Sequence, residues 1–428
     1  MSSYDGATAL IPVTGGLGVL AAMRDLGREG IGTSCGRPRR DSPLRPSRYA
    51  SWSDDALPPS GHQDDSFRWL LRAADPGAGT VLMPAPDDLV WLAAERQAEL
   101  ADRYRLYYPT GETVYALLNK ERLHAVAAAH GVAMPDSWFP TSREDALRVA
   151  REVRAPLVLK PKTHVGIRGW TKGAIAQSSR ELPEVYDRVV ARLRYDPVIS
   201  ERDPSIRLPF LQRYHRGAGG NIYNLVGFID QSGQMAGYRA TRKVLQYPRR
   251  LGVGVCFEAA PVSLELAARV TGMLKAIGFY GIFEAEFIDR DGELLLIDFN
   301  PRLFQSVGFV VARGLRLPFL WFLAANGDWA AVEEELARAR RLEDGRGQPS
   351  RWVHRFALET MVASRLATLR MSPADGARWL GWALDRRSRT MDAAGAPDDP
   401  WPGRLNGLQH LVMFARDPRF LVGTFVKD

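Results

Sequence analysis

The nonapeptide Leu-Leu-Leu-Ile-Asp-Phe-Asn-Pro-Arg at 294–302 ends an apolar run with a carboxylate, an amide and a guanidinium. Side chains alternate between the two faces of a β-strand, so Asp298 and Asn300 are expected to project from one face. Ile297 and Phe299 are expected to project from the other face and to anchor the strand in apolar packing. The residue types therefore predict a buried strand whose polar end lies at a functional site.

The segment before this strand carries a second pair of acidic residues, Glu284 and Glu286, which are also spaced by two. The turn Asp-Arg-Asp-Gly joins the two segments, so we expect a hairpin that brings these carboxylates close to Asp298. Clustered carboxylates repel one another, and a divalent cation relieves that repulsion. Mg²⁺ is usually bound by one or two carboxylates together with substrate phosphates. The hairpin therefore predicts a metal site; the alternative is a solvated strand end with a surface Asp and an Asn turn.

The composition indicates a soluble globular protein. The chain has 428 residues, of which 46% are hydrophobic and 25% charged, and this length predicts two or three domains. Cys35 and Cys256 are far apart and form no metal or redox motif, so a cytoplasmic location is the simplest expectation. The N-terminus does not resemble a signal peptide, and no apolar window is long enough for a membrane helix.

The net charge of +8 raises the question of a nucleic-acid partner. The arginines are scattered singly and no nucleic-acid-binding signature occurs, so an arginine-biased chain is the better interpretation. Lysine is rare: the chain has seven, and five of them lie between residues 120 and 243. Because an ammonium group is a compact charge that binds phosphate flexibly, this clustering indicates a requirement for lysine there, with chance as the alternative.

The surrounding pattern predicts the elements that position these residues. Over the first 110 residues, strand-like runs at 7–13 and 79–85 alternate with helical patterns, which predicts a parallel α/β layer, and 36–61 is expected to be mainly loop. Further on, hairpins are expected at 155–179 and 221–244, and a helix at 263–278. The last hundred residues are helical by pattern.

The hairpin resembles the metal-binding strands of the ATP-grasp superfamily, which carry Glu on one strand and Glu-x-Asn-x-Arg on the next. The resemblance implies ATP and Mg²⁺ as cofactors, with Mn²⁺ as an alternative ion. It implies that Glu286, Asp298 and Asn300 bind two metal ions, with Glu284 as a competing ligand, and that Arg302 steadies a phosphate or acyl-phosphate. Asp298 stands where the family usually has Glu.

Other segments follow in the family's order over about 115–325. They resemble its entry helix, lysine-bearing strand, glycine-rich lid, adenine-binding hinge and phosphate-binding basic segment. The nucleotide-binding residues that this order implies are Lys120, Lys160, Gly166, Gly169, Gln212, Arg213 and Tyr214. Arg213 stands where the hinge usually has Glu. The resemblance also implies that Arg242 and Lys243 neutralise the β- and γ-phosphates, whereas Lys162 and Lys172 are expected to be surface charges of the lid.

The resemblance predicts an α/β and α+β protein with three parts. These are a doubly wound pre-ATP-grasp domain over 1–114, an ATP-grasp domain of two α+β lobes over 115–328 with its lid lobe at about 155–212, and a helical C-terminal region over 329–428. Within the superfamily, the chain resembles D-aspartate ligase-type and carbamoyl-phosphate-synthase-like members, and its segments RDLGREGI and PSRYAS are similar to the opening of D-aspartate ligase-type members. Arg48 and Tyr49 are candidates for the border of the acceptor-carboxylate site.

The implied activity is an ATP-dependent carboxylate–amine ligase that forms an amide through an acyl-phosphate and releases ADP and phosphate. The implied partners are a small-molecule carboxylate and an amine, without nucleic acid or membrane, and a homodimer is compatible with the family. Alternatives are a carboxylate kinase, a thiol ligase, or a regulatory protein with a worn ATP site.

Overall fold

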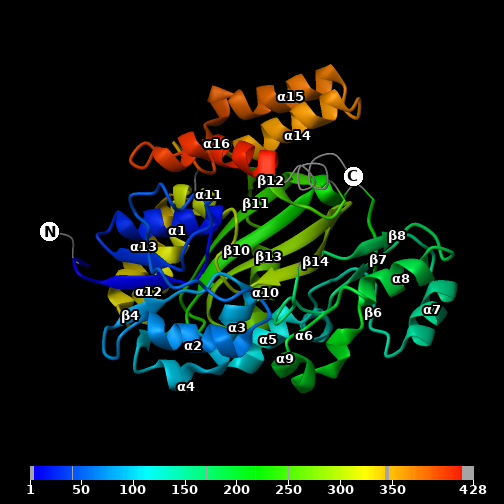
Figure 1. Cartoon of the computed structure of the whole chain (residues 1–428), viewed down its shortest axis with the longest axis horizontal. Helices are drawn as coiled ribbons and strands as arrows, with labels where there is room; N and C mark the ends of the chain where they lie inside the picture. The colour runs from blue at the N-terminus through cyan, green and yellow to red at the C-terminus, as the bar shows by residue number, and fades with distance from the viewer. Residues whose placement is uncertain are drawn as a thin grey trace.

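The computed structural model describes residues 4–40, 42–169, 172–216, 218–248, 250–342 and 347–416. Figure 1 shows two small α/β units on either side of a central sheet of long strands, with a layer of C-terminal helices above it. None of the helices in these ranges combines the length and apolarity needed to cross a bilayer.

The first sheet has five parallel strands in the order β3-β2-β1-β4-β5, which confirms the predicted α/β layer. The strands are β1 (Thr8–Ile11), β2 (Gly32–Cys35), β3 (Ser51–Trp52), β4 (Thr80–Leu82) and β5 (Tyr104–Arg105). The helices between them are α1 (Leu17–Gly27), α2 (Gln63–Ala73), α3 (Asp87–Glu95) and α4 (Gln97–Leu100). The order reverses between β1 and β4, and ligands of such sheets bind beyond the carboxyl ends of the strands at that point.

Three later helices belong to the same hydrophobic cluster as the first sheet. They are α11 (Val307–Ala312), α12 (Leu317–Ala325) and α13 (Trp329–Arg341). Contact with α1 is close, because a Cβ atom added at Gly18 would lie 2.1 Å from the carbonyl oxygen of Phe304. The segment after the predicted metal hairpin is therefore held against the start of α1.

The central sheet has seven strands in the order β14-β13-β10-β11-β12-β15-β16. Its long antiparallel strands are β10 (Ile222–Ile229), β11 (Ala236–Tyr247), β12 (Val253–Ala260), β13 (Gly281–Arg290) and β14 (Glu293–Asn300). The predicted hairpins β10–β11 and β13–β14 are both confirmed. Apolar residues of α10 (Leu264–Ala276), whose N-terminus is capped by Ser263, join the hydrophobic cluster of this sheet.

The third sheet is small and antiparallel, with the order β6-β9-β7-β8. Its strands are β6 (Ser137–Trp138), β7 (Leu157–Lys160), β8 (Ala174–Ala176) and β9 (Phe210–Arg213), and α7 (Arg143–Glu152) and α8 (Leu182–Val190) share its hydrophobic cluster. The predicted β7–β8 hairpin is confirmed. The connecting helices are α5 (Gly111–Leu118), α6 (Lys120–Ala129), α9 (Pro197–Arg202) and two short 3₁₀ helices, η1 (Pro204–Arg207) and η2 (Ala218–Gly220).

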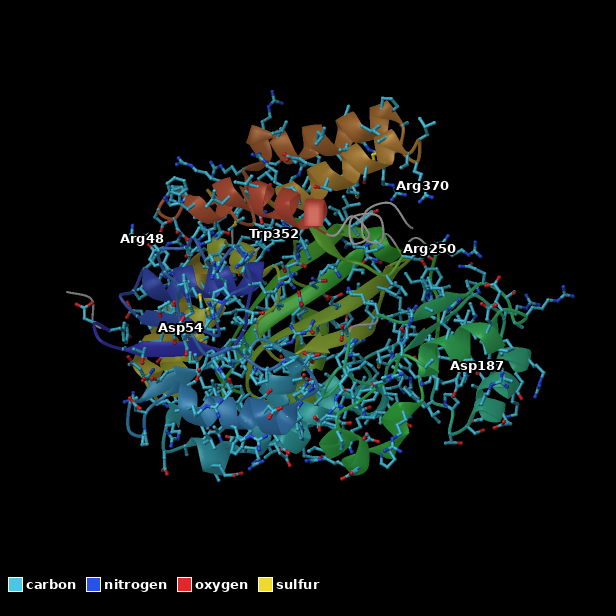
Figure 2. The ribbon with its side chains drawn as sticks, viewed as in Figure 1. Arg48, Asp54, Asp187, Arg250, Trp352 and Arg370 are labelled. Carbon is cyan, nitrogen blue, oxygen red and sulfur yellow. The ribbon has the colours of Figure 1, made fainter. Side chains whose placement is uncertain are left out.

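The C-terminal region contains strands as well as the predicted helices. β15 (Arg351–Val353) pairs with β12 and with β16 (Thr390–Asp392), so the central sheet continues into this region. Three-residue strands are too short to show a period of two, which is why the sequence pattern did not reveal them. The helices are α14 (Arg355–Ala367), α15 (Pro373–Leu384), η3 (Arg386–Ser388) and α16 (Trp401–Arg416). Trp352, labelled in Figure 2, is buried at this junction, with its ring centroid 5.3 Å from that of Phe257.

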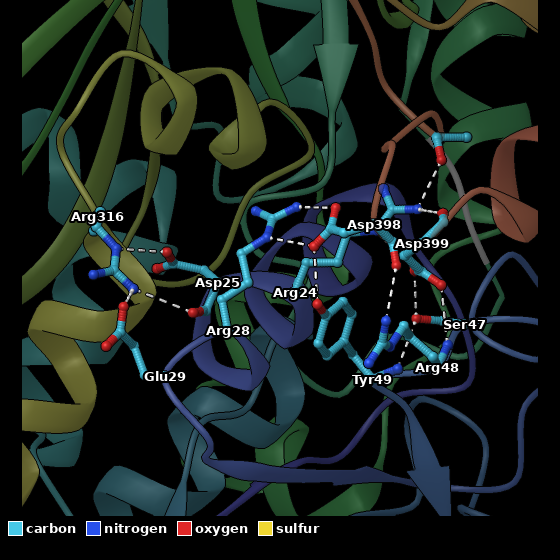
Figure 3. Close-up of polar contacts among 11 residues, drawn as sticks. Arg24, Asp25, Arg28, Glu29, Ser47, Arg48, Tyr49, Arg316, Asp398 and Asp399 are labelled. Atoms are coloured by element: carbon cyan, nitrogen blue, oxygen red, sulfur yellow. Dashed lines mark hydrogen bonds and ion pairs between the residues drawn. The ribbon is translucent and has the colours of Figure 1, made fainter. Parts of the chain in front are cut away.

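A buried ion pair fastens the loop before α16 to the first domain (Figure 3). The Arg24 Nε atom lies 2.9 Å from Asp399 Oδ2, and both side chains are at most 5% exposed. The Ser47 hydroxyl donates to the same carboxylate at 2.7 Å, and the backbone N–H of Arg48 donates to it at 3.0 Å. Asp399 therefore accepts from three groups of the first domain.

The neighbouring Asp398 makes a more exposed contact with the same domain (Figure 3). Arg28 binds it through two nitrogens at 2.8 Å, and the Tyr49 hydroxyl donates to it at 2.8 Å. Burial, and then the hydrogen bond to Asp398, raise the pKa of Tyr49. Arg48 and Tyr49, predicted at the border of an acceptor site, instead hold this loop, and neither residue lines either of the two cavities described below.

Candidate functional site

The hairpin β13–β14 brings the predicted carboxylates together. Glu286 is the direct cross-strand partner of Asp298, and Glu284 is the partner of Asn300. Side chains of directly opposed residues project from the same face of an antiparallel pair. All four side chains line one cavity of about 720 Å³, as the spacing by two predicted.

A β-bulge changes the expected position of one residue in this hairpin. The register shifts after Glu286, so that Phe287 faces Leu296 and Ile297 is left without a partner. Phe299 is fully buried in the hydrophobic cluster, as expected, but Ile297 is only partly buried and lines the cavity. The prediction that Ile297 anchors the strand on the opposite face is therefore wrong, because strict alternation does not hold across a bulge.

The wall of the cavity comes from the central sheet, from the third sheet and from segments outside the strands of the first sheet, such as Pro86 and Asp87. Eight further residues that the sequence predicted to bind ATP or to act in catalysis also line it: Lys120, Lys160, Gly169, Gln212, Arg213, Tyr214, Lys243 and Arg302. The same cavity is lined by Arg250, which Figure 2 labels near the end of the central sheet. Residues from segments nearly 200 positions apart thus converge on one volume.

Each of the two outer carboxylates is paired with its own lysine. Lys243 Nζ donates to Glu286 Oε2 at 2.8 Å, and Lys120 Nζ donates to Asp298 Oδ1. Burial by itself would raise the pKa of Asp298, but the charge and hydrogen bond of Lys120 outweigh burial and hold that pKa well below its usual range. Burial opposes the charge of Lys243, whose pKa is nevertheless raised by Glu286. The cavity therefore holds alternating charges.

Glu284 lies deeper than the other carboxylates and is 5% exposed. It accepts from Asn224 Nδ2 at 3.2 Å and from Asn300 Nδ2 at 3.0 Å. Burial, and then the neighbouring Glu286, raise the pKa of Glu284 above its usual range. Glu284, which was predicted as a competing metal ligand, thus lines the cavity and orients Asn300, whose Oδ1 atom accepts from Arg302 at 3.0 Å.

Arg302 connects the hairpin to the first domain. Its Nε donates to Asp87 at the start of α3, and its NH1 group donates to the carbonyl oxygen of Leu303 at 3.0 Å. Burial disfavours the guanidinium charge, but Asp87 more than compensates and the pKa of Arg302 is raised. Asp87 is a site residue that no motif in the sequence indicated.

The donor set fits a divalent cation that is shared with phosphate oxygens. Among the described residues, no group of three or more His, Cys, Asp and Glu side chains is placed to hold a metal ion by itself. Glu286 and Asp298 nevertheless supply two carboxylates from directly opposed positions, and Asn300 supplies an amide oxygen beside them. Mg²⁺ commonly takes one or two carboxylates and completes its shell with waters and substrate phosphates.

Two predicted phosphate-binding residues do not reach the cavity. Arg242 is bound to Asn221 and, at 2.9 Å, to Asp289, because it neighbours Lys243 on a strand and so projects from the opposite face. Gly166 is buried, and its N–H donates to Asp88 Oδ1 at 2.6 Å. Both residues serve local structure here, whereas Gly169 of the same loop lines the cavity.

The hinge residues are arranged mainly around β9. Gln212 accepts from Lys160 Nζ at 3.0 Å and donates to Ser137 at 3.1 Å, which fixes the lysine at the cavity wall. The Arg213 side chain forms an exposed ion pair with Asp136, in which Nε donates to Oδ2 at 2.8 Å. The backbone N–H of Tyr214 donates to the carbonyl oxygen of Pro156 at 3.1 Å.

Lys162 and Lys172 were predicted to be surface charges of the lid, but the clustering of lysines between residues 120 and 243 had indicated a specific requirement for lysine there. Lys172, expected to be a surface charge, lines the cavity and donates to the carbonyl oxygen of Gly252. Lys162 is buried and donates to Glu121 at 2.6 Å, while its carbonyl oxygen accepts from the N–H of Lys120. Both predictions of a surface position are therefore wrong.

Comparison with known proteins supports a common fold. No protein-family model matches the chain. It is 23% identical over 194 residues to the carbamoyl phosphate synthase large chain of Vibrio vulnificus, a stretch that covers 45% of this chain and 17% of that relative. The chain thus matches less than a fifth of that relative's length.

Solved structures extend the likeness to three quarters of the chain. Biotin carboxylase from Campylobacter jejuni superposes with a TM-score of 0.57 at 16% identity, covering 75% of this chain and 71% of that one. An L-amino acid ligase from Bacillus licheniformis superposes with a TM-score of 0.52 at 15% identity, covering 74% and 73%. Identities this low establish the likeness of the fold alone.

Proposed function

Because the chain has the fold of the ATP-grasp superfamily, to which these relatives and neighbours belong, we propose that it is an ATP-dependent carboxylate–amine ligase. The observation that carries this proposal is the convergence of Lys120, Lys160 and Lys243 with the opposed carboxylates Glu286 and Asp298 in one cavity. Lysines suit the phosphates of ATP, and the carboxylates suit Mg²⁺.

In the proposed reaction, a carboxylate oxygen of the substrate attacks the γ-phosphorus of ATP. The bond between that phosphorus and the β–γ bridging oxygen breaks, and ADP leaves. The amine nitrogen then attacks the carbonyl carbon of the acyl-phosphate, loses a proton, and inorganic phosphate leaves. Catalysis of such transfers rests mainly on positioning and on stabilising negative charge.

The residues of the cavity have separate roles in this proposal. Lys160, fixed by Gln212, and Lys120 bind phosphate oxygens, and Lys243 neutralises charge next to Glu286. Arg302, held by Asp87, is positioned to stabilise the transferred phosphoryl group. Glu286, Asp298 and Asn300 would hold Mg²⁺ (or Mn²⁺), which supplies further neutralisation of phosphate charge.

The test uses substitutions that keep the side-chain shape. Glu286→Gln and Asp298→Asn should each lower ADP release from Mg–ATP by about 10²–10³-fold, measured with a panel of carboxylates and hydroxylamine as the trapping amine. Glu293→Gln is the matched control, because Glu293 lies on β14 together with Asp298 but pairs with Arg290 outside the cavity. Its activity should equal that of the unmodified protein.

The products separate this function from its alternatives. Hydroxamate formation supports the acyl-phosphate, and a stable amide with a natural amine supports the ligase. ADP release with transfer of phosphate and no amide would assign the carboxylate kinase, and a thioester would assign the thiol ligase. Binding of Mg–ADP without any turnover would assign the regulatory protein with a worn site.

A further inference from the structure

A second cavity of about 650 Å³ lies beside the first. Its wall includes the segment after β1 (13–19), the residues before α3 (Ala85 and Pro86), and the segment 302–305. The first two lie at the carboxyl ends of β1 and β4, where the strand order of the first sheet reverses. This reversal is where ligands of doubly wound sheets bind.

The two cavities share part of their lining. Arg302, Phe304 and Gln305 line both, so a group bound in the second cavity can meet a phosphate bound in the first at Arg302. His354 and Asn406 of the C-terminal region also line the second cavity. The volume is in the range of pockets for small molecules.

The charge of the second cavity differs from that of the first. Among the described residues, no Asp or Glu lines the second cavity, whereas Arg39 and Arg302 both do. The N-terminus of α1 also opens there, and no side chain caps it. The first N–H groups of a helix lack acceptors within the helix and favour negative charge, so this lining is complementary to an anion.

The remaining wall is largely apolar, with Val13, Leu17, Val19, Leu303 and Phe304 as its main hydrophobic members. Among the lining residues that the structure describes, an ammonium group buried against such a wall would find no carboxylate to pair with, and burying an unpaired charge is strongly unfavourable. The lining thus accepts a carboxylate at its basic end and an uncharged body elsewhere. It disfavours a free amino acid, which carries both charges.

We infer that the second cavity binds the carboxylate substrate, and that this substrate is an acid with an apolar body and no free ammonium group. The inference rests on the proposed function, since it places the acid next to the γ-phosphate of ATP. In this arrangement the carboxylate lies at Arg39 and Arg302, and the apolar body extends along 13–19 towards the C-terminal region.

The test compares 4-methylpentanoate with L-leucine, which differ only by the ammonium group. With the full chain and saturating Mg–ADP, 4-methylpentanoate should bind at least about ten-fold more tightly than L-leucine by calorimetry. N-acetyl-L-leucine, whose nitrogen is uncharged, should bind like 4-methylpentanoate. The same order is expected for hydroxamate formation with Mg–ATP.

A pair of arginine variants locates the binding. Arg39→Gln should weaken 4-methylpentanoate binding by about ten-fold and leave the Kd for Mg–ADP unchanged. Arg37→Gln is the matched control, because Arg37 is exposed on the same segment and does not line the cavity. Thr14→Asp, which adds a carboxylate to the lining, should shift the preference towards L-leucine.

The outcomes distinguish the two proposals. L-leucine that binds as tightly as 4-methylpentanoate, or more tightly, would overturn this inference and leave the proposed function standing. The same holds if neither 4-methylpentanoate nor N-acetyl-L-leucine binds while Mg–ADP does. If the Arg39→Gln variant binds 4-methylpentanoate as tightly as the unmodified protein, the acid binds outside the second cavity and the inference is overturned. If Mg–ADP itself does not bind, the proposed function fails and the inference fails with it.

Discussion

Glu286 on β13 and Asp298 on β14 are direct cross-strand partners, yet each carboxylate is paired with a different lysine, Lys243 and Lys120 respectively. Two carboxylates at opposed positions would otherwise repel each other. The lysines come from β11 and from the start of α6, so the charge balance of the site depends on three separate segments.

Lys120→Met should weaken Mg–ADP binding by about ten-fold or more, because it removes a phosphate ligand and the partner of Asp298. It should also lower the free energy of unfolding by about 1 kcal/mol, since Asp298 is partly exposed. Lys275→Met, which changes an exposed lysine of α10, is the control and should alter neither quantity. Unchanged nucleotide affinity in Lys120→Met would contradict the assignment.

Nucleotide affinity should fall as the pH rises through about 8. Burial lowers the pKa of Lys160 to about 8, and burial together with Lys243 lowers the pKa of Lys172 to about 8. Both ammonium groups therefore lose their charge, and their attraction for phosphate, above that pH. The Kd for Mg–ADP measured between about pH 7 and about pH 9 should rise, and the Lys160→Met/Lys172→Met double variant should flatten the profile.

The same two lysines affect stability with the opposite sign. Their folded-state pKa lies below the unfolded value of about 10.4, so the unfolded chain binds more protons between about pH 8 and about pH 10.4. The free energy of unfolding that these two lysines contribute therefore increases as the pH rises through this window, which means that the folded state becomes more stable. Thermal unfolding of the double variant against the unmodified protein measures that contribution, and parallel profiles would contradict it.

Asp399→Asn should lower the free energy of unfolding by about 3–5 kcal/mol, because it leaves the buried guanidinium of Arg24 without its charge partner. The exposed neighbouring pair gives the control: Arg28→Gln should cost at most about 1 kcal/mol. Calorimetric unfolding of the two variants tests the difference. Equal losses would show that burial of the Arg24–Asp399 pair does not decide its contribution.

Gly18→Ala should destabilise the protein by about 1–3 kcal/mol, because the added Cβ atom would lie 2.1 Å from the carbonyl oxygen of Phe304. The substitution should also weaken binding of 4-methylpentanoate, since α1 and 302–305 both line the second cavity. Gly272→Ala on α10 is the control, because nothing lies within 4 Å of its added Cβ atom. That variant should be stabilised by about 0.5–1 kcal/mol through helix propensity.

The hairpin and its carboxylates were predictable because the period of two and the turn residues are local properties of the sequence. The exception, Ile297, results from a bulge that alternation cannot reveal. Arg242 and Lys243 were both assigned to phosphate, although neighbouring residues of a strand project from opposite faces, so the sequence could have excluded one of them. Which one faces the cavity depends on the pairing with β10 and β12.

The second cavity could not be predicted, because its wall joins residues far apart in the chain. Arg39, Arg302 and Asn406 belong to segments without a common motif, and only packing brings them to one volume. Gly166 was likewise assigned from its loop, whereas its N–H binds the Asp88 carboxylate of the first domain. Contacts between distant segments leave no local pattern in the sequence.

The pairing of β15 with β12 has a consequence for handling the protein. In a chain shortened before residue 347, the eight-residue strand β12 would form the border of the central sheet, with unpaired N–H and C=O groups along it. Long uncovered borders of this kind recruit strands from other molecules. Removal of the C-terminal region should therefore yield aggregates instead of a smaller working enzyme.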